Sequence, residues 1–412
     1  MNQTVLKVGT GVSDITPALE VGFLTSSVRG TYAPFKSVRS PLKARAIALE
    51  VGAHVVVLVS LDLLGLSEDA VYGWERFKAA SCGTVPVDNV IITCTHTHSA
   101  PESLALSDLY IADSYKQWLG QLEGAIRKTI SHALNTLKPV STVEISASEL
   151  DGFSLLRRIA LPQGIVMSDT MQPVAADLFA RRPIDRRVRV LRFLSTDGNS
   201  LASIVHFVCH PVHEMLFPSV SPDFPGELCA ILESEPTNGF PMFLNGAAGN
   251  INPPTVSWGV EYTLKHAEAI AKKVVEQTDA ERETVTDLLQ MSQSMDFDIR
   301  RGANLPISDA RAVIRLVRIG RVAMVFIPGE PFVETALRIE QNSPFEHTIV
   351  VGYSECSVGY IPTSHAFEEG GYEIGPGKWS YLEADAEERI YREAVSMLNR
   401  LYENEINLAN SI

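Results

Sequence analysis

The chain has 412 residues, of which 45% are hydrophobic, with a formal net charge of −14 and a pI of about 5.2. A surface this acidic repels nucleic-acid phosphates and anionic membranes, so we expect neither as a partner. The longest apolar runs, such as Val55–Ser60, are far shorter than the ~20 residues that a membrane-spanning helix needs. The first residues, Met1–Thr4, lack the charge and apolar run of a secretory signal, so we expect a cytoplasmic protein without stable membrane association.

Three pairs of apolar segments flank short turns and predict β-hairpins. In chain order they are 46–51 with 55–60, 188–193 with 201–208, and 312–319 with 322–327. Amphipathic patterns predict helices over 114–137, 262–277 and 385–402. Because hairpins dominate over regular βαβ alternation, we predict an α+β fold in which layered mixed or antiparallel β-sheets are flanked by helices.

Several apolar segments end in residues that are common in catalytic and metal sites. Asp62, His96, His210 and Glu330 each follow one of them, and Tyr360 lies shortly after another. Loops just beyond rigid strand ends are where sites are usually built. Polar residues also mark where any strand reaches solvent, but their coincidence at several independent ends favours a functional site.

The histidines of His96-Thr97-His98 are two residues apart, so both would lie on one face of an extended segment. Zinc binds neutral imidazoles together with a carboxylate, and a catalytic zinc keeps one position open. A pair of histidines that only hydrogen-bond locally is the simpler alternative for this motif alone. His206 and His213, on either side of His210, are expected to be ordinary core or surface residues.

A loop of small residues, 245–254, follows a further apolar segment and contains Asn250 and Asn252. Its glycines would let backbone amides approach a ligand closely, although turns rich in Asn and Gly are common without one. Asp62 and Asp223 are candidates for substrate contacts or for hydrogen bonds that support the metal ligands. Asp223 also precedes a helical pattern, and a helix N-cap is the favoured role for it.

Taken in order, these motifs resemble the neutral/alkaline non-lysosomal ceramidase family over about Val8 to Glu373. The stretch THTHSAP at 95–101 is the most diagnostic of them. The other matching stretches are GTGVSDITP at 9–17, SPLKARA at 40–46, SLD at 60–62, CHP at 209–211, GNINP at 249–253, IPGE at 327–330 and GYIPT at 359–363.

The resemblance implies one zinc ion per chain and a ceramidase-like catalytic fold. Carried over motif by motif, the zinc ligands would be His96, His210, Glu330 and Tyr360. His98 would lie beside the metal and assist the reaction. The arginine that the family places near the substrate carbonyl would be Arg157 or Arg158, and we favour Arg158.

The sequence departs from the family in two places. The family's loop reads GDVSP, and Asn252 stands where its catalytically important serine would be. Asparagine cannot act as the same hydroxyl nucleophile, but it can hydrogen-bond a substrate or a developing oxyanion. The chain also ends soon after the helix predicted at 385–402, without the family's separate C-terminal β-domain, so a single catalytic domain over residues 1–412 is expected.

We therefore expect a zinc-dependent amidohydrolase that cleaves the N-acyl bond of a small polar substrate. His98 would transfer a proton, Arg158 and Asn252 would stabilise negative charge, and Asp62, Asp223 and Asn250 would contact the substrate. The alternatives are a zinc-dependent lactonase, esterase or lyase acting on a sugar-like or polyol-like compound, a true ceramidase, or a non-catalytic module with a structural metal. The expected partner is a small molecule, and the oligomeric state is left open.

Overall fold

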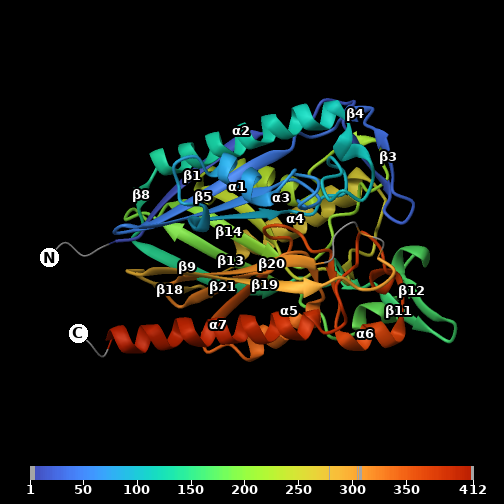
Figure 1. Cartoon of the computed structure of the whole chain (residues 1–412). Helices are drawn as coiled ribbons and strands as arrows, with labels where there is room; N and C mark the ends of the chain where they lie inside the picture. Colours follow the sequence, from blue (N-terminus) through green and yellow to red (C-terminus); the bar gives the residue numbers. More distant parts are fainter. Residues whose placement is uncertain (1–4, 278, 304, 306–308, 410–412) are drawn as a thin grey trace.

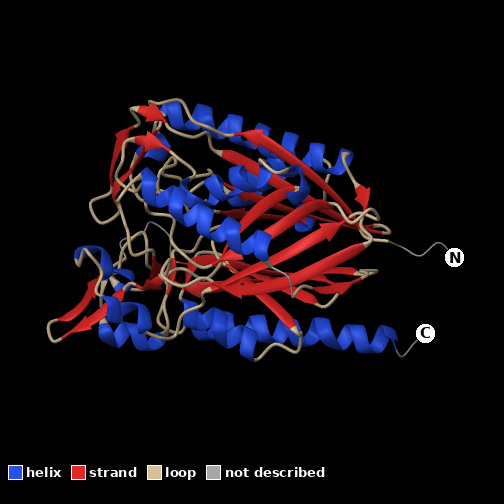
Figure 2. Ribbon diagram, turned by 180° about the vertical axis from the view of Figure 1, so that it is seen from behind, coloured by secondary structure: helices blue, strands red, loops and turns tan. Residues whose placement is uncertain are grey.

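Three large sheets form the framework of the part of the chain that this computed structural model describes, residues 5–277, 279–303, 305 and 309–409 (Figure 1). Each sheet has four or five strands, and each carries helices on its outer face (Figure 2). The arrangement confirms the predicted α+β fold with mixed sheets flanked by helices.

The first sheet has the strand order β7-β6-β5-β1-β8 and lies under helices α1 (Trp74–Cys82) and α2 (Asp113–Asn135). Helix α2 lies very close to β1, because a Cβ on Gly9 would come 2.0 Å from the carbonyl oxygen of Ala133. Only glycine fits at such an approach. The strands are β1 (Lys7–Asp14), β5 (Lys43–Val51), β6 (His54–Leu61), β7 (Val90–Cys94) and β8 (Lys138–Pro139).

The second sheet has the order β16-β14-β13-β9-β18 and packs against α3 (Asp223–Glu233) and α4 (Val260–Glu276). Strands β13 and β14 form an antiparallel hairpin, and β16 adds to β14 in parallel. The strands are β9 (Thr142–Glu149), β13 (Arg187–Leu194), β14 (Ser200–Phe207), β16 (Phe240–Asn245) and β18 (Glu281–Glu283).

The third sheet has the order β19-β20-β21-β23 and packs against α5 (Val333–Gln341) and α7 (Ala386–Ala409). Its last strand again runs parallel to its neighbour. The strands are β19 (Leu288–Asp298), β20 (Asp309–Ile319), β21 (Val322–Phe326) and β23 (His347–Val351).

The inner faces of all three sheets meet in one central core. Leu49 of the first sheet, Ile204 of the second and Met324 of the third belong to a single cluster of buried apolar side chains. Alternate residues of the same strands point outward and pack on the helices, as Val325 does. Because both faces of these strands are buried, their sequences are nearly continuous apolar runs.

Short strand pairs gather at the end of the molecule away from the two termini, at the right of Figure 1. Loops that carry site residues follow five strands with parallel neighbours, namely β7, β14, β16, β21 and β23. The short elements are β2 (Gly22–Ser26) with β3 (Thr31–Pro34), β4 (Ser37–Val38) with β15 (Ser219–Val220), β10 (Leu155–Leu156) with β17 (Ile251–Asn252), β11 (Arg158–Leu161) with β12 (Gly164–Met167), β22 (Glu330–Pro331) with β24 (Tyr360–Ile361), and α6 (Ser364–Glu369).

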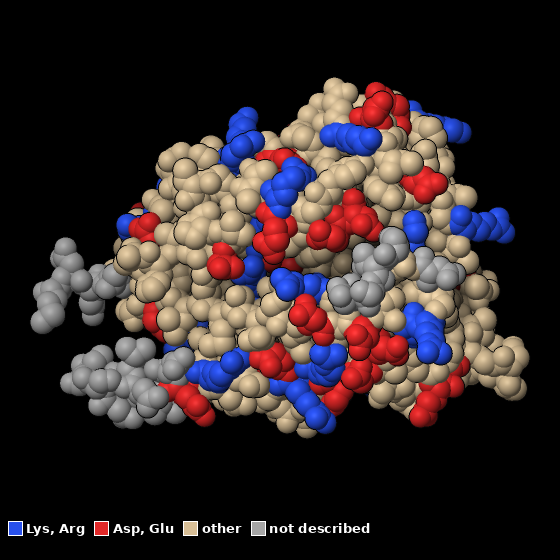
Figure 3. Space-filling view, viewed as in Figure 1, with Lys and Arg blue, Asp and Glu red and all other residues tan. Residues whose placement is uncertain are grey.

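All three predicted hairpins and all three predicted helices are present, with ends shifted by a few residues except at the C-terminal end of α7. Among the described residues, the helices are each too short or too polar to cross a lipid bilayer. Figure 3 shows acidic and basic side chains interspersed over one face of the molecule. The single-domain organisation and the absence of nucleic-acid partners stay predictions.

Candidate metal centre

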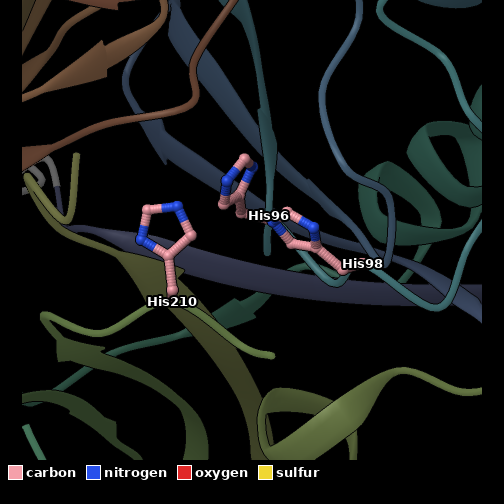
Figure 4. A group of neighbouring side chains, drawn as sticks. All are labelled: His96, His98 and His210. Atoms are coloured by element: carbon pink, nitrogen blue, oxygen red, sulfur yellow. The ribbon is translucent and has the colours of Figure 1, made fainter. Parts of the chain in front are cut away.

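Three histidines converge where the first and second sheets meet. His96 and His98 come from the loop after β7, and His210 comes from the loop after β14. One ring nitrogen from each lies within 4.8 Å of the others, and the three imidazoles face a common space (Figure 4). His96 and His210 are each 1% exposed, so water does not compete strongly for them.

The two histidines of the first motif reach this space by a different route from the one predicted. Strand β7 ends at Cys94, and His96 has a φ of 72°, so the segment is not extended. His96 and His98 therefore do not share one space because they lie on the same face of a strand. A turn of the backbone brings them together instead. Likewise, His210 lies three residues beyond the end of β14 at Phe207.

Backbone carbonyls set the tautomers of two of the rings. His96 Nδ1 lies 2.5 Å from the carbonyl oxygen of Leu64, and His210 Nδ1 lies 3.0 Å from that of Ile251. A neutral ring that donates from Nδ1 presents a lone pair on Nε2, as metal-binding histidines do. Burial, with the nearby charge of Arg157, lowers the pKa of His210 to about 4 and so keeps its ring neutral.

Glu330, the first residue of β22, completes the group. Its Oε2 lies 3.3 Å from Nε2 of His96 and 3.3 Å from Nε2 of His210. Ligand atoms ~2.0–2.1 Å from a tetrahedral zinc ion are roughly 3.3–3.4 Å apart, so this spacing fits zinc.

The polar atoms that face one another here lack other partners. Nε2 of His96, Nε2 of His98 and Oε2 of Glu330 are buried and have no hydrogen bond within the described part of the chain. Unsatisfied buried polar atoms are rare, and each needs an explanation such as an ion. With Nε2 of His210, which lies equally close to Glu330, these atoms offer neutral imidazoles and one carboxylate, the ligand types that zinc prefers.

Two tyrosines are candidates for a fourth ligand. Tyr360 pairs with Glu330 in the β22–β24 register, and its hydroxyl accepts a hydrogen bond of 2.9 Å from Arg157 Nη2. Tyr353, which the resemblance does not nominate, stacks on the His96 ring with centroids 4.0 Å apart. Its buried hydroxyl has no hydrogen-bond partner among the described residues. The structure therefore places both near the group.

The arginine that reaches the histidines is Arg157. Its Nη1 lies 3.3 Å from Nε2 of His210 and 3.4 Å from Oδ1 of Asn252. The Nε atom donates to Glu373 over 2.8 Å. Burial disfavours a charged guanidinium, but Tyr360 and Glu373 outweigh that effect and raise the pKa of Arg157 well above its usual value. The guanidinium is thus held charged beside the imidazoles.

Arg158, which the sequence analysis favours, points elsewhere. Its guanidinium binds Glu373 Oε2 at 2.7 Å, Glu369 Oε2 at 3.1 Å and the carbonyl oxygen of Gly370 at 2.7 Å. Both arginines bind Glu373, but only Arg157 also reaches His210 and the cavity. The geometry therefore favours Arg157 over Arg158 as the arginine near the substrate carbonyl.

The residues proposed for substrate contacts make hydrogen bonds within the protein instead. Asp62 Oδ2 accepts from the amide of Lys43 at 2.8 Å. Asn250 Oδ1 accepts from the amide of Val333 at 2.9 Å, while its Nδ2 donates to Glu334 at 2.8 Å. None of these atoms lines the cavity beside the histidines, whereas Asn252 does.

Asp223 is also buried away from the cavity. It is the first residue of α3, and the N-cap position is occupied by Pro222. Its carboxylate accepts from the amides of Glu214 at 3.0 Å and Phe224 at 2.7 Å. Both predicted roles of Asp223, the substrate contact and the N-cap, are thus replaced by support of the loop that follows His210.

A side chain that the sequence analysis does not single out, Asn245 at the end of β16, links the two histidine loops. Its Nδ2 donates to the carbonyl oxygen of Thr95 at 3.1 Å and to that of Cys209 at 3.0 Å, one residue before each histidine. Its Oδ1 accepts from the amide of Cys209 at 3.4 Å, and the side chain is fully buried. Its only sequence signal is an amide at the end of an apolar run.

A cavity of about 330 Å³ opens onto the histidines and Glu330, within the range typical of small-molecule sites. Arg157 and Asn252 contribute polar atoms to it. Much of the remaining wall is apolar, which differs from the polar pocket that we expected. The apolar lining includes Leu24, Leu64, Leu104, Met167, Val212 and Trp379.

Neither protein-family models nor curated proteins match this sequence. By structure, however, the chain has the fold of the neutral ceramidases. It is similar to the neutral ceramidase from Pseudomonas aeruginosa with 19% sequence identity and a TM-score of 0.78, over 98% of this chain and 75% of that one. It is also similar to a ceramidase complexed with C2, with 20% identity and a TM-score of 0.75, over 97% of this chain and 76% of the other. The predicted fold is thereby confirmed.

Proposed function

We propose that the chain is a zinc-dependent hydrolase that cleaves the amide bond of a small N-acyl substrate. The observation that carries the proposal is the position of Glu330 Oε2, which lies 3.3 Å from Nε2 of both His96 and His210, a spacing that fits tetrahedral zinc, beside a cavity. The likeness to ceramidase structures supports an amide as the bond that is cleaved.

His96, His210 and Glu330 would hold the ion, with Tyr360 or Tyr353 as the fourth protein ligand. When bound, zinc would supply Lewis-acid activation of water and of the substrate carbonyl. The carbonyls of Leu64 and Ile251 keep the two rings in the tautomer that this role needs.

His98 would move the proton. Its Nε2 lines the cavity and has no hydrogen-bond partner among the described residues, so it is free to accept a proton and pass it to the leaving nitrogen. Burial, together with the His96 and His210 rings, lowers the pKa of His98 well below its ordinary value, so the ring is neutral at rest.

Arg157 and Asn252 would orient the carbonyl and stabilise the negative charge that develops on its oxygen. A preorganised donor in a dry site is typically worth ~100- to 1,000-fold in rate. Glu373 and Tyr360 hold the guanidinium in place. Asn252 stands where the resembling family has a serine, and its hydrogen bond with Arg157 gives it a positioning role that needs no hydroxyl.

The apolar wall favours a second candidate, hydrolysis of a long-chain N-acyl substrate such as ceramide. A small cavity with apolar walls would accept a short acyl group equally well. The polar amine portion of the substrate would then lie away from the apolar part of the wall. Of the two, we favour the small substrate because the cavity is only about 330 Å³.

The test is turnover of a matched panel by the zinc-loaded protein. Short N-acyl amines, the corresponding O-acyl esters, lactones and a detergent-dispersed long-chain ceramide would be compared by kcat/KM. The proposal expects the short amides to be the best substrates. His98→Gln serves as the matched inactive control, because it keeps the size and a polar end but not the basicity of the ring. Zinc-loaded protein that hydrolyses lactones or ceramide and ignores short amides would refute the proposal.

A further inference from the structure

One acidic side chain in the cavity is not used by the proposed reaction. Asp169 belongs to the short 3-10 turn η3 (Ser168–Thr170), which follows the β11–β12 hairpin, and it lines the same cavity as the histidines. Its Oδ1 atom is buried and accepts no hydrogen bond from the described residues. A buried carboxylate oxygen without a donor is unfavourable, so a partner from outside the chain is the natural explanation.

The fold holds this carboxylate in place. Ser168 directly precedes Asp169, and its amide donates to the carbonyl oxygen of Arg157 at 2.8 Å. This hydrogen bond ties the turn to the backbone of the site arginine. The hydroxyl of Thr170 donates to the carbonyl oxygen of Met167 at 2.6 Å, which fixes the other side of the turn. The backbone on both sides of Asp169 is therefore held by hydrogen bonds.

The cations near Asp169 already have partners. Arg157 pairs with Glu373 at 2.8 Å, and Arg158 pairs with the other oxygen of the same carboxylate at 2.7 Å. Glu373 and Glu369 together balance the charges of these two arginines, so Asp169 does not serve that purpose. Arg181, farther along, donates to the carbonyl oxygen of Arg158.

Three hydroxyl groups of the cavity also have partners of their own. The hydroxyls of Ser27 and Tyr372 lie 2.6 Å apart, and Thr25 bonds with Thr31. Much of the remaining wall is apolar. Asp169 thus presents a negative charge to a cavity in which the described cations are engaged elsewhere.

We propose that Asp169 determines substrate specificity by binding an ammonium group on the amine portion of the substrate. This inference rests on the proposed amide hydrolysis and names its substrate class, an N-acylated amine that bears a second, charged amino group. A hydroxyl could satisfy the hydrogen bond but not the charge, so ammonium is the better partner. The net charge of −14 would also attract a cationic substrate.

Three substrates test the proposal. They share one short acyl group and one four-carbon amine, and they end in an ammonium, a hydroxyl or a methyl group. Wild-type protein should prefer the ammonium substrate over the methyl substrate by at least ~10-fold in kcat/KM, since hydrogen bonds to charged groups are worth that much. Asp169→Asn should abolish most of this preference, because it should lower kcat/KM for the ammonium substrate far more than for the methyl substrate.

The matched control is Asp177→Asn. Asp177 lies in η4 (Ala176–Ala180) of the same connection, is exposed, and does not line the cavity. The variant removes the same charge but should keep the ammonium preference. The specificity role would be overturned if Asp169→Asn lowered kcat/KM equally for all three substrates. It would also be overturned if the wild-type protein hydrolysed all three with the same kcat/KM.

Binding of the free amines separates this inference from the proposed function. Calorimetry would compare 1,4-diaminobutane with butylamine on wild-type protein and on Asp169→Asn. Tighter diamine binding that Asp169→Asn abolishes supports the role of Asp169, even if none of the three amides is hydrolysed and the proposed reaction fails. Absence of any diamine preference in both binding and turnover would overturn the inference.

Discussion

Replacing Asn245 by alanine tests whether this amide positions the two zinc-binding loops. The variant removes three hydrogen bonds, two to the carbonyls that precede His96 and His210 and one from the amide of Cys209. Each buried hydrogen bond contributes ~1 kcal/mol net, so we expect the free energy of unfolding of the metal-free protein to fall by about 3 kcal/mol.

The larger effect should be on the metal. Replacing a residue whose hydrogen bonds orient the metal ligands typically lowers metal affinity by ~10- to 100-fold. We expect a loss of that size in zinc affinity, measured by competition with a chromophoric chelator. Asn245→Asp provides a second variant, because it keeps the volume but loses both donors and places a carboxylate against two carbonyl oxygens.

Asn89→Ala is the matched control. Asn89 also makes two side-chain hydrogen bonds, to the carbonyl of Val55 and from Gln290, but it lies outside the site. It should lower the free energy of unfolding without changing zinc affinity. If Asn245→Ala and Asn89→Ala lose stability alike and both bind zinc like the wild type, the positioning role of Asn245 is refuted.

Two further variants separate roles within the site. His96→Ala should lose zinc and activity together, whereas His98→Ala should keep zinc and lose ~100- to 10,000-fold in kcat, as measured by elemental analysis beside turnover. The opposite pattern would exchange the two roles. Arg157→Ala should lower kcat/KM for the best amide by ~100-fold or more, while Arg158→Ala, its neighbour in sequence, should leave kcat/KM within a few-fold of wild type. Similar losses in both would show that the ion pairs around Glu373, rather than contact with the substrate, set the rate.

The hairpins and long helices could be predicted because their patterns are local. Successive side chains of segments 46–51 and 55–60 point alternately to two buried faces, and a two-residue turn joins the segments. This pattern can be recognised without information from residues far away in the sequence. The meeting of three sheets in one core could not be predicted in this way. It depends on contacts such as that of Leu49 with side chains hundreds of residues later in the chain, which no local pattern encodes.

The site shows the same division. Residue types at strand ends led to His96, His210 and Glu330, and the structure brings these three together. The choice between Arg157 and Arg158 depends on how the chain passes from β10 to β11, because Arg157 lies between the two strands, and no local pattern encodes that geometry. Asn245 was missed because its role lies in which backbone carbonyls surround it, which only the folded chain defines.

The three candidate ligands come from three different sheets. His96 follows the first sheet, His210 the second and Glu330 the third, so a bound ion would tie the sheets together where they meet. The ligands lie far apart along the chain, and their spacing exists only after every sheet has docked. Metal occupancy would therefore report on complete assembly of the molecule. A substitution in the shared core, remote from the cavity, would displace one sheet and weaken zinc binding even where the chain stays folded. Bound zinc would in turn stabilise the assembled state by mass action.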